Sequence, residues 1–126
     1  MAEFTHLHVH SHYSLLDGLG TIPLLVERIE ELGMKSVALT DHGVMHGAVE
    51  FYQAATATGI KPIIGVEAYL APQGHQNKRG SVDTKPRHLT LLAQNNRGYQ
   101  NLMQLTTEAH LHGYYYKPRI DYDLLE

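Results

Sequence analysis

The sequence contains no cysteine, so it can form neither disulfide bonds nor metal sites built on thiolates. A chain without cysteine suits a reducing compartment, and we expect a cytoplasmic protein. No apolar run reaches the roughly 20 residues that cross a membrane, and the opening MAEF is not a signal peptide. Neither sign of charge dominates, because the net charge is −3 with the histidines neutral. We therefore expect no membrane contact, and the overall charge does not by itself predict nucleic-acid binding.

Histidine, in contrast, is abundant. The chain has 10 histidines, as many as lysine and arginine together. In THLHVHSHYSLLDG, residues 5–18, a histidine occupies every second position from His6 to His12. Side chains two apart on an extended strand share one face, so this stretch lines up imidazoles where an ordinary strand has aliphatic residues. At 126 residues the chain is one domain or a piece of one.

Short apolar stretches alternate with amphipathic ones along the chain. The pattern predicts strands over residues 3–11, 35–40, 61–71 and 88–93, and helices over 22–33, 46–59 and from 95 or 96 onward. In the second helix we expect Val49, Tyr52 and Ala55 to face inward. Residues 72–86 resemble a loop, and a further helix is expected from Asp121. Strands and helices at this spacing are typical of parallel β-α-β units, so we expect an α/β fold, the first part of a barrel or open sheet.

Polar residues gather where the predicted strands end. In parallel α/β folds the reactive groups lie at the carboxyl ends of the strands and in the loops that follow them. Imidazoles and carboxylates from four consecutive units are therefore expected to meet at one mouth. These residues are His8, His10, Asp17, Asp41, His42, Glu67 and His88.

The H-x-H element explains the repeated histidines. His8 and His10 share one face of the strand, with Cα atoms about 6–7 Å apart, and both imidazoles reach one cation at about 2.0–2.1 Å. A single histidine is more often a hydrogen-bonded packing residue, but Asp17, His42 and Glu67 at neighbouring strand ends favour a metal site. Nitrogen and oxygen ligands without sulfur suit Zn²⁺, Mn²⁺ or Fe²⁺ and argue against Ca²⁺ or Cu⁺.

The neighbouring residues are expected to have supporting roles. His6 lies on the same face but deeper in the strand, so we expect it to pack beside the ligands. His12 lies past the strand end, facing either solvent or substrate, and is left without a role. Asp41 either caps the following helix or hydrogen-bonds to a ligand imidazole. Four histidines in helices or loops are expected to be solvated: His46, His75, His110 and His112.

The loop before the fourth predicted strand is rich in cations. It carries Lys78, Arg79, Lys85 and Arg87 against one acid, Asp83. These side chains are candidates for phosphate contacts near the mouth, and the alternative is an ordinary solvated loop.

Four stretches of the chain resemble a known family. HLHVHSHYSLLDG, ALTDHG, AVEFYQAATATGIKPIIGVEAY and RHLTLLAQNNRGYQNLMQL are similar to the polymerase and histidinol phosphatase (PHP) domain, and YYKPRIDYDLL continues the match. GIKPIIGVEAY, following TDHG at this spacing, is typical of the branch found in bacterial replicative DNA polymerases. The H-x-H pair alone is a weak signal, but the match extends over nearly the whole chain.

The resemblance implies a fold and a set of ligands. PHP domains are distorted (β/α)₇ barrels with up to three metal ions at the carboxyl mouth, so residues 1–126 would be the N-terminal portion of such a barrel, truncated before closure, in a larger polymerase chain. His8, His10 and Glu67 match the ligands of one metal. Glu67 would bridge to a second metal that His88 also binds, and Asp17 and His42 match ligands of the third. The remaining ligands of the family belong beyond residue 126.

The resemblance also implies a function. The first hypothesis is metal-dependent phosphoester hydrolysis that needs no Ser, Cys or Lys nucleophile. In a polymerase this suggests 3′→5′ proofreading exonuclease activity on the 3′ end of the primer strand, with pyrophosphate as another substrate. The expected partners are DNA, the polymerase core of the parent chain and other replisome subunits. The alternatives are a structural or docking module with a non-catalytic cluster, and a stand-alone PHP phosphatase.

Overall fold

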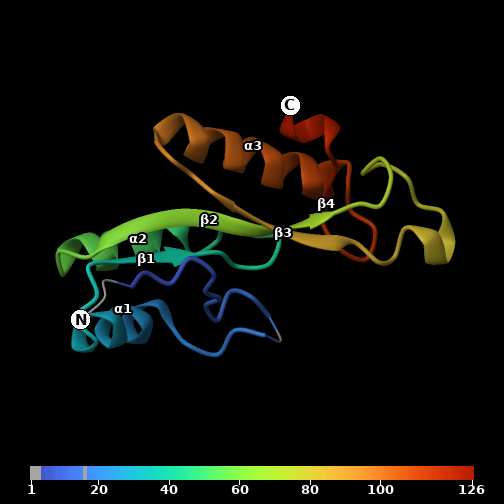
Figure 1. The fold of residues 1–126 in the computed structure, drawn as a ribbon. Coiled ribbons are helices and arrows are strands. Elements are labelled where there is room, and N and C mark those ends of the chain that lie inside the picture. Colours follow the sequence, from blue (N-terminus) through green and yellow to red (C-terminus); the bar gives the residue numbers. More distant parts are fainter. Residues whose placement is uncertain (1–3, 16) are drawn as a thin grey trace.

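The computed structural model describes residues 4–15 and 17–126. Figure 1 shows the strands between α3 on one side and α1 with the N-terminal segment on the other. In chain order the elements are α1 (Ile22–Glu31), β1 (Ser36–Leu39), α2 (Ala48–Ala57), β2 (Lys61–Leu70), η1 (Gly80–Val82), β3 (Arg87–Leu92), α3 (Asn96–Leu111), β4 (Arg119–Ile120) and η2 (Asp123–Leu125). The mixed α/β architecture is therefore as predicted, except that the helix expected from Asp121 is only the single turn η2.

The long strand β2 organises the sheet. Along one edge its first half pairs with β1 in parallel, and its last two residues pair with β4, also in parallel. Between them the loop after β1 continues the contact, because Glu67 N–H donates to the Asp41 carbonyl at 3.0 Å. The other edge of β2 pairs with β3 from Gly65 to Leu70. The loop that follows β1 is thus fixed against the carboxyl half of β2.

The direction of β3 differs from the prediction. A parallel strand was expected over 88–93, but β3 runs antiparallel to β2, with Tyr69 opposite His88. The reason is the connection: residues 71–86 contain only the short turn η1 and no crossover helix, and a chain that turns back without a crossover pairs antiparallel. As a result the start of β3, and not its end, lies at the carboxyl end of β2.

The histidine-rich segment is extended but forms no regular strand. Of the strand predicted over 3–11, the first residue lies outside the described residues. The rest runs beside β1 with a single parallel bridge between His6 and Val37. The ladder is interrupted because Val9 N–H donates to the Thr40 hydroxyl at 2.9 Å instead of to a backbone carbonyl. The segment nevertheless stays attached to β1, since Thr40 N–H donates to the Val9 carbonyl at 2.8 Å.

Two apolar clusters hold these elements together. The first joins α1, β1 and α2 around buried side chains such as Ile22 and Phe51. The inward face of α2 is formed by Phe51 and Ala55, whereas Val49 and Tyr52, predicted to face inward, are 60% and 56% exposed. Phe51 and Ala55 are one turn apart and fill the core, which turns Val49 and Tyr52 to the opposite flank. No helix in the described part of the chain is long and apolar enough to span a membrane.

The second cluster determines which side chains of β2 face the mouth. Val66, Ala68 and Leu70 pack against α3 and β4. Because successive strand residues point to opposite faces, Glu67 and Tyr69 project to the other side. The alternation of apolar and functional residues in GVEAYL therefore directs Glu67 away from the helix layer.

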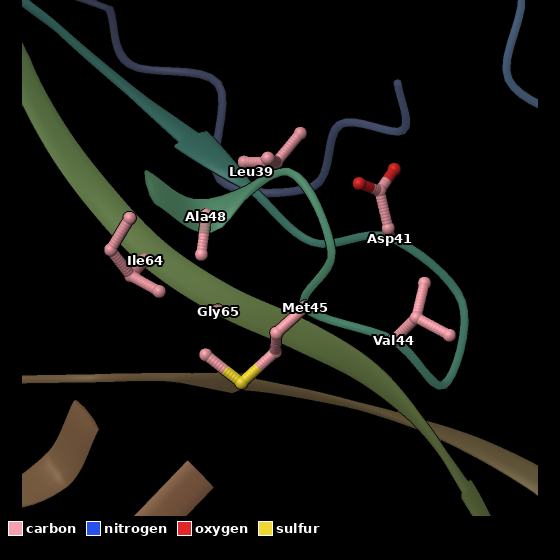
Figure 2. A pocket seen from close by; sticks show the side chains of 7 residues that line it. All are labelled: Leu39, Asp41, Val44, Met45, Ala48, Ile64 and Gly65. Atoms are coloured by element: carbon pink, nitrogen blue, oxygen red, sulfur yellow. The ribbon is translucent and has the colours of Figure 1, made fainter. Parts of the chain in front are cut away.

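The loop between β1 and α2 is packed tightly onto β2. Figure 2 shows the small space where this loop turns back, and the space is too small for a water molecule. It is lined by Leu39, Asp41, Val44, Met45, Ala48, Ile64 and Gly65. This region is therefore packed interior and not a ligand site. Its side chains hold the loop that carries His42 against β2.

Candidate metal centre

All six predicted ligand residues come together at one edge of the sheet. His8 and His10 come from the N-terminal segment, Asp17 from the loop after it, and His42 from the loop after β1. Glu67 lies on β2, and His88 lies at the start of β3, where its antiparallel direction brings it to the same mouth. The described residues form three groups in which the potential ligand atoms of each group all lie within 4.8 Å of one another. The groups are His8–His10–Glu67, His10–Asp17–His42 and His42–Glu67–His88.

Glu67 connects two of these groups. Its Oε2 atom accepts hydrogen bonds from Nε2 of His8 at 2.5 Å and of His10 at 2.6 Å. Its Oε1 atom lies 2.8 Å from Nδ1 of His88 and 3.0 Å from Nε2 of His42. The two oxygens of one carboxylate therefore face two different pairs of imidazoles, which is the arrangement of a bridging ligand.

The environment keeps Glu67 ionised. The residue is 4% exposed, and burial raises the pKa of its carboxyl. Hydrogen bonds from His8 and His10, with the charge of His42, oppose this effect and lower the pKa to about 2. At neutral pH Glu67 therefore offers both oxygens as anionic ligands.

Asp17 is held in place by a serine that the sequence reasoning missed. One carboxylate oxygen of Asp17 contacts Nδ1 of His42 and lies 3.3 Å from Nδ1 of His10. The other accepts a hydrogen bond from the buried Ser14 hydroxyl at 2.6 Å. Burial raises the pKa of Asp17, but the hydrogen bonds from Ser14 and His42 outweigh it and lower the pKa. A serine three residues before an acidic ligand is a local signal that could have identified Ser14.

The donor set fits a divalent metal cluster. The donors are imidazole nitrogens and carboxylate oxygens, which bind Zn²⁺, Mn²⁺ and Fe²⁺. In a tetrahedral site with bonds of about 2.0–2.1 Å, neighbouring ligand atoms are about 3.3 Å apart. The separations that Glu67 makes with its four histidines, 2.5 to 3.0 Å, need only a small outward movement of the side chains to match.

Two of the predicted supporting residues have other contacts. His6 is exposed and packs edge-on against Phe4. It precedes His8 by two residues and lies farther from the mouth. Asp41 neither caps α2 nor contacts an imidazole in the described part of the chain. Its carboxylate accepts from Ser11 N–H at 2.6 Å and from the Ser11 hydroxyl at 2.8 Å, and its side chain projects from the loop in Figure 2. Asp41 thus fixes the loop directly after His10.

The expectation of solvated histidines holds for three of the four. His46, His110 and His112 are exposed. His75 is buried, because its backbone N–H and Nδ1 both bond to Asp121 Oδ2, at 2.7 and 2.6 Å. His12, which had no assigned role, packs against Tyr13 with ring centroids 4.2 Å apart and the ring planes tilted by 36°.

The cationic loop is partly neutralised. Arg79 donates from its guanidinium to both oxygens of Asp83, at 2.9 and 3.0 Å, and to Gln73 at 2.8 Å. Arg87 lies opposite Leu70, next to the candidate ligand His88. Phosphate contacts by Lys78, Arg79, Lys85 and Arg87 remain a prediction.

A tyrosine also belongs to the surroundings of the centre. The ring of Tyr69 stacks on His42, at 5.3 Å between centroids and 11° between planes, and meets His88 edge-on. Gly43, at a φ of +65°, makes this contact possible, since a Cβ there would lie 3.0 Å from the Tyr69 ring. No spacing rule in the sequence singles out Tyr69, because its partners come from distant segments.

One known family matches nearly the whole chain. The PHP domain family matches residues 6–126. The chain belongs to the PHP domain family. The resemblance seen in the sequence is thereby confirmed, and the six residues of the centre all lie within the matched part of this PHP domain.

Its relatives support the narrower resemblance to the polymerase branch. DNA polymerase III subunit alpha of Helicobacter pylori is 53% identical over 124 residues, covering 98% of this chain and 10% of the relative. The subunit of Borreliella burgdorferi is 48% identical, covering 99% of the chain and 11% of the relative. The subunit of Thermus aquaticus is 49% identical, covering 98% of this chain and 10% of the relative. The PHP domain described here thus spans about a tenth of the length of these relatives.

Solved structures support the fold. An amidohydrolase from Chromobacterium violaceum, with bound sulfate and no metal, is 25% identical with a TM-score of 0.56 and covers 82% of this chain and 34% of that one. A protein from Bifidobacterium adolescentis named as a metal-dependent phosphoesterase has a TM-score of 0.58 at 22% identity. The match covers 83% of this chain and 34% of that one. The predicted α/β fold, part of a PHP barrel, is confirmed.

Proposed function

We propose that this PHP domain is a metal-dependent phosphodiesterase, with a cluster of up to three Zn²⁺, Mn²⁺ or Fe²⁺ ions held by His8, His10, Asp17, His42, Glu67 and His88. In the parent protein, a DNA polymerase like its relatives, it would remove nucleotides from the 3′ end of the primer strand. The observation that carries this proposal is the contact pattern of the Glu67 carboxylate, whose two oxygens face two different groups of histidines. Neighbouring metals bridged by a carboxylate are suited to phosphoryl chemistry.

The residues of the chain have distinct parts in this proposal. Glu67 and Asp17 supply the negative charge that retains divalent ions, and their lowered pKa values keep that charge at neutral pH. Ser14 fixes Asp17, and Asp41 fixes the turn after His10. Metal ions bound here would lower the pKa of a water molecule and neutralise charge on the phosphate oxygens.

The test compares two pairs of histidine substitutions in the full-length protein. His8→Ala/His10→Ala removes two proposed ligands, whereas His46→Ala/His110→Ala removes two exposed histidines outside the centre. We expect the first pair to lose bound metal and 3′-end removal from a labelled primer, and the second pair to keep both. Unchanged 3′-end removal in the first pair would contradict the proposal.

A structural role for the cluster is distinguished by the same proteins. The six ligands connect the N-terminal segment, the loop after β1, β2 and β3, so a bound cluster would also cross-link the fold. If the wild type binds metal and chelation lowers its Tm, but it cleaves neither primer DNA nor pyrophosphate, then the cluster is a scaffold. If the wild type cleaves either substrate, a purely structural role for the cluster is excluded.

A further inference from the structure

A tightly closed turn lies beside the metal centre, between α3 and β4. Arg119 N–H donates to the Gly113 carbonyl at 3.3 Å, and the Arg119 guanidinium donates to the same carbonyl at 3.0 Å. Inside it, Tyr115 N–H donates to the Lys117 carbonyl at 3.0 Å. A Cβ on Gly113 would lie 2.0 Å from the Arg119 carbonyl oxygen, so the closure depends on glycine. We call residues 114–117 the tyrosine turn.

The tyrosine turn presents an aromatic ring at a conformational cost. Tyr116 has a φ of 58°, the left-handed region that side chains other than those of Gly, Asn and Asp rarely adopt. Tyr116 is 71% exposed and its ring meets that of the neighbouring Tyr115 edge-on, so burial in the described chain offsets little of this strain. Strained residues concentrate where ligands bind. A glycine at 116 would close the same turn without strain, which suggests that the ring itself is needed.

Lys117 joins the turn to the metal centre. Its ammonium lies 5.5 Å from the centroid of the Tyr69 ring, within the range of a cation–π contact. Tyr69 in turn stacks on the candidate ligand His42. The next residue, Pro118, is held against Gly43, where a Cβ would lie 2.8 Å from its ring. The turn is therefore packed against the loop that carries His42.

The charges nearby leave Lys117 suited to an anion. Arg119 is fully buried and directs its guanidinium at backbone carbonyls, and Arg79 is occupied by Asp83. Lys117 is exposed, and within the described part of the chain its ammonium contacts an aromatic ring and forms no ion pair with a carboxylate. A phosphate beside the scissile one could bind its ammonium without breaking an ion pair.

We propose that the tyrosine turn binds single-stranded nucleic acid, with Lys117 contacting a backbone phosphate and Tyr116 stacking on a base. This deepens the proposed function, on which it rests, by naming the residues that would hold the nucleic-acid strand beside the metal centre. Exposed aromatic rings beside cations are the usual platform for single strands, because every base has a face to stack on. A small phosphate ester would need the cation but not the ring.

The first test locates the contact without requiring hydrolysis. The full-length protein is irradiated with a single-stranded oligonucleotide that carries 5-iodouracil near its 3′ end, and the cross-linked peptide is identified by mass spectrometry. We expect the cross-link on Tyr116, its loss in Tyr116→Ala and its retention in Tyr116→Phe. Tyr52→Ala is the matched control, because Tyr52 is 56% exposed and lies on α2 beside the opposite end of β2. No cross-link within residues 114–117 would overturn the proposal.

The second test measures kinetics on two substrates, an oligonucleotide and the small diester bis(4-nitrophenyl) phosphate. We expect Tyr116→Ala to raise the KM for the oligonucleotide about 5-fold or more relative to the small diester. Lys117→Gln should lower the salt dependence of that KM by about 0.7 in slope, whereas Lys61→Ala should not. If both substrates are cleaved and the ratio of their kcat/KM values is unchanged in both variants, the turn has no such role. A protein that cross-links at Tyr116 but cleaves neither substrate would refute the phosphodiesterase and not the binding site.

Discussion

Ser14 and Asp17 form a hydrogen bond of 2.6 Å between hydroxyl and carboxylate, and the same hydroxyl accepts the backbone N–H of His42 at 3.1 Å. One buried serine thus positions two candidate ligands. Groups that orient metal ligands typically contribute 10- to 100-fold to metal affinity. We expect Ser14→Ala to weaken metal binding by about that factor, measured by titration of the metal-free protein. Ser36→Ala, which removes the hydroxyl contact with Thr5, is the control and should leave affinity unchanged.

Glu67 should be the ligand whose loss removes the most metal. Because its two oxygens face different groups of histidines, Glu67→Gln weakens two sites, whereas His8→Ala weakens one. Glutamine keeps the shape but removes the charge. We expect elemental analysis to show a larger loss of metal equivalents per chain in Glu67→Gln than in His8→Ala. Equal losses would mean that Glu67 does not bridge.

The sequence predicted which polar residues lie together better than it predicted the sheet. His8, His10, His42 and Glu67 could be placed at one mouth because strand ends meet there in an α/β fold. His88 reached the same mouth for a reason that the pattern could not give, since β3 is antiparallel and begins where a parallel strand would end. Hydrophobic periodicity gives the position of a strand, but its direction depends on whether a crossover helix precedes it.

The missed residues share a physical cause. His75 is buried by Asp121, which is 46 residues away in the sequence, and Tyr69 contacts the distant Lys117. Such pairs have no periodic signal, so only the folded chain brings them together. Helix faces were also ambiguous where several residues were apolar, and Phe51 took the core position expected for Tyr52.

Gly18 should be essential to the loop that carries Asp17. A Cβ at Gly18 would lie 1.9 Å from the Ser11 carbonyl oxygen, whereas a Cβ at Gly20 would meet nothing within 4 Å. We expect Gly18→Ala to displace the loop, lowering both Tm and metal content. Gly20→Ala should keep the metal content and leave the free energy of unfolding unchanged or raised by up to about 1 kcal/mol. Thermal unfolding and elemental analysis of the two proteins test this, and equal behaviour would contradict it.

Asp83 should contribute to stability against acid. Hydrogen bonds from Arg79 lower the pKa of this carboxyl to about 2, from the 3.8 of an unperturbed aspartate. Because the folded pKa is the lower one, the contribution is fully present above pH 4 or so and is lost as the pH falls toward 2. We expect Asp83→Asn to reduce the difference in unfolding free energy between pH 6 and pH 2.5. Glu31→Gln, which breaks an exposed pair with Arg28, should leave that difference as it is.

Arg119 should stabilise the loop of residues 72–86 and the tyrosine turn together. Its buried guanidinium donates to the carbonyls of Gly113, Asp83, His75 and Asn77, at 2.7 to 3.1 Å. Arg119→Met leaves the carbonyls of Asp83, His75 and Asn77 without this donor, whereas the Gly113 carbonyl keeps the backbone N–H of residue 119. Each buried carbonyl left without a partner costs about 1–3 kcal/mol. We expect a loss of at least about 3 kcal/mol in urea denaturation, with faster amide exchange in residues 75–84. Arg28→Met, at an exposed site, should change the free energy by less than about 0.5 kcal/mol. If both variants unfold at the same urea concentration, Arg119 is not the link between the two segments.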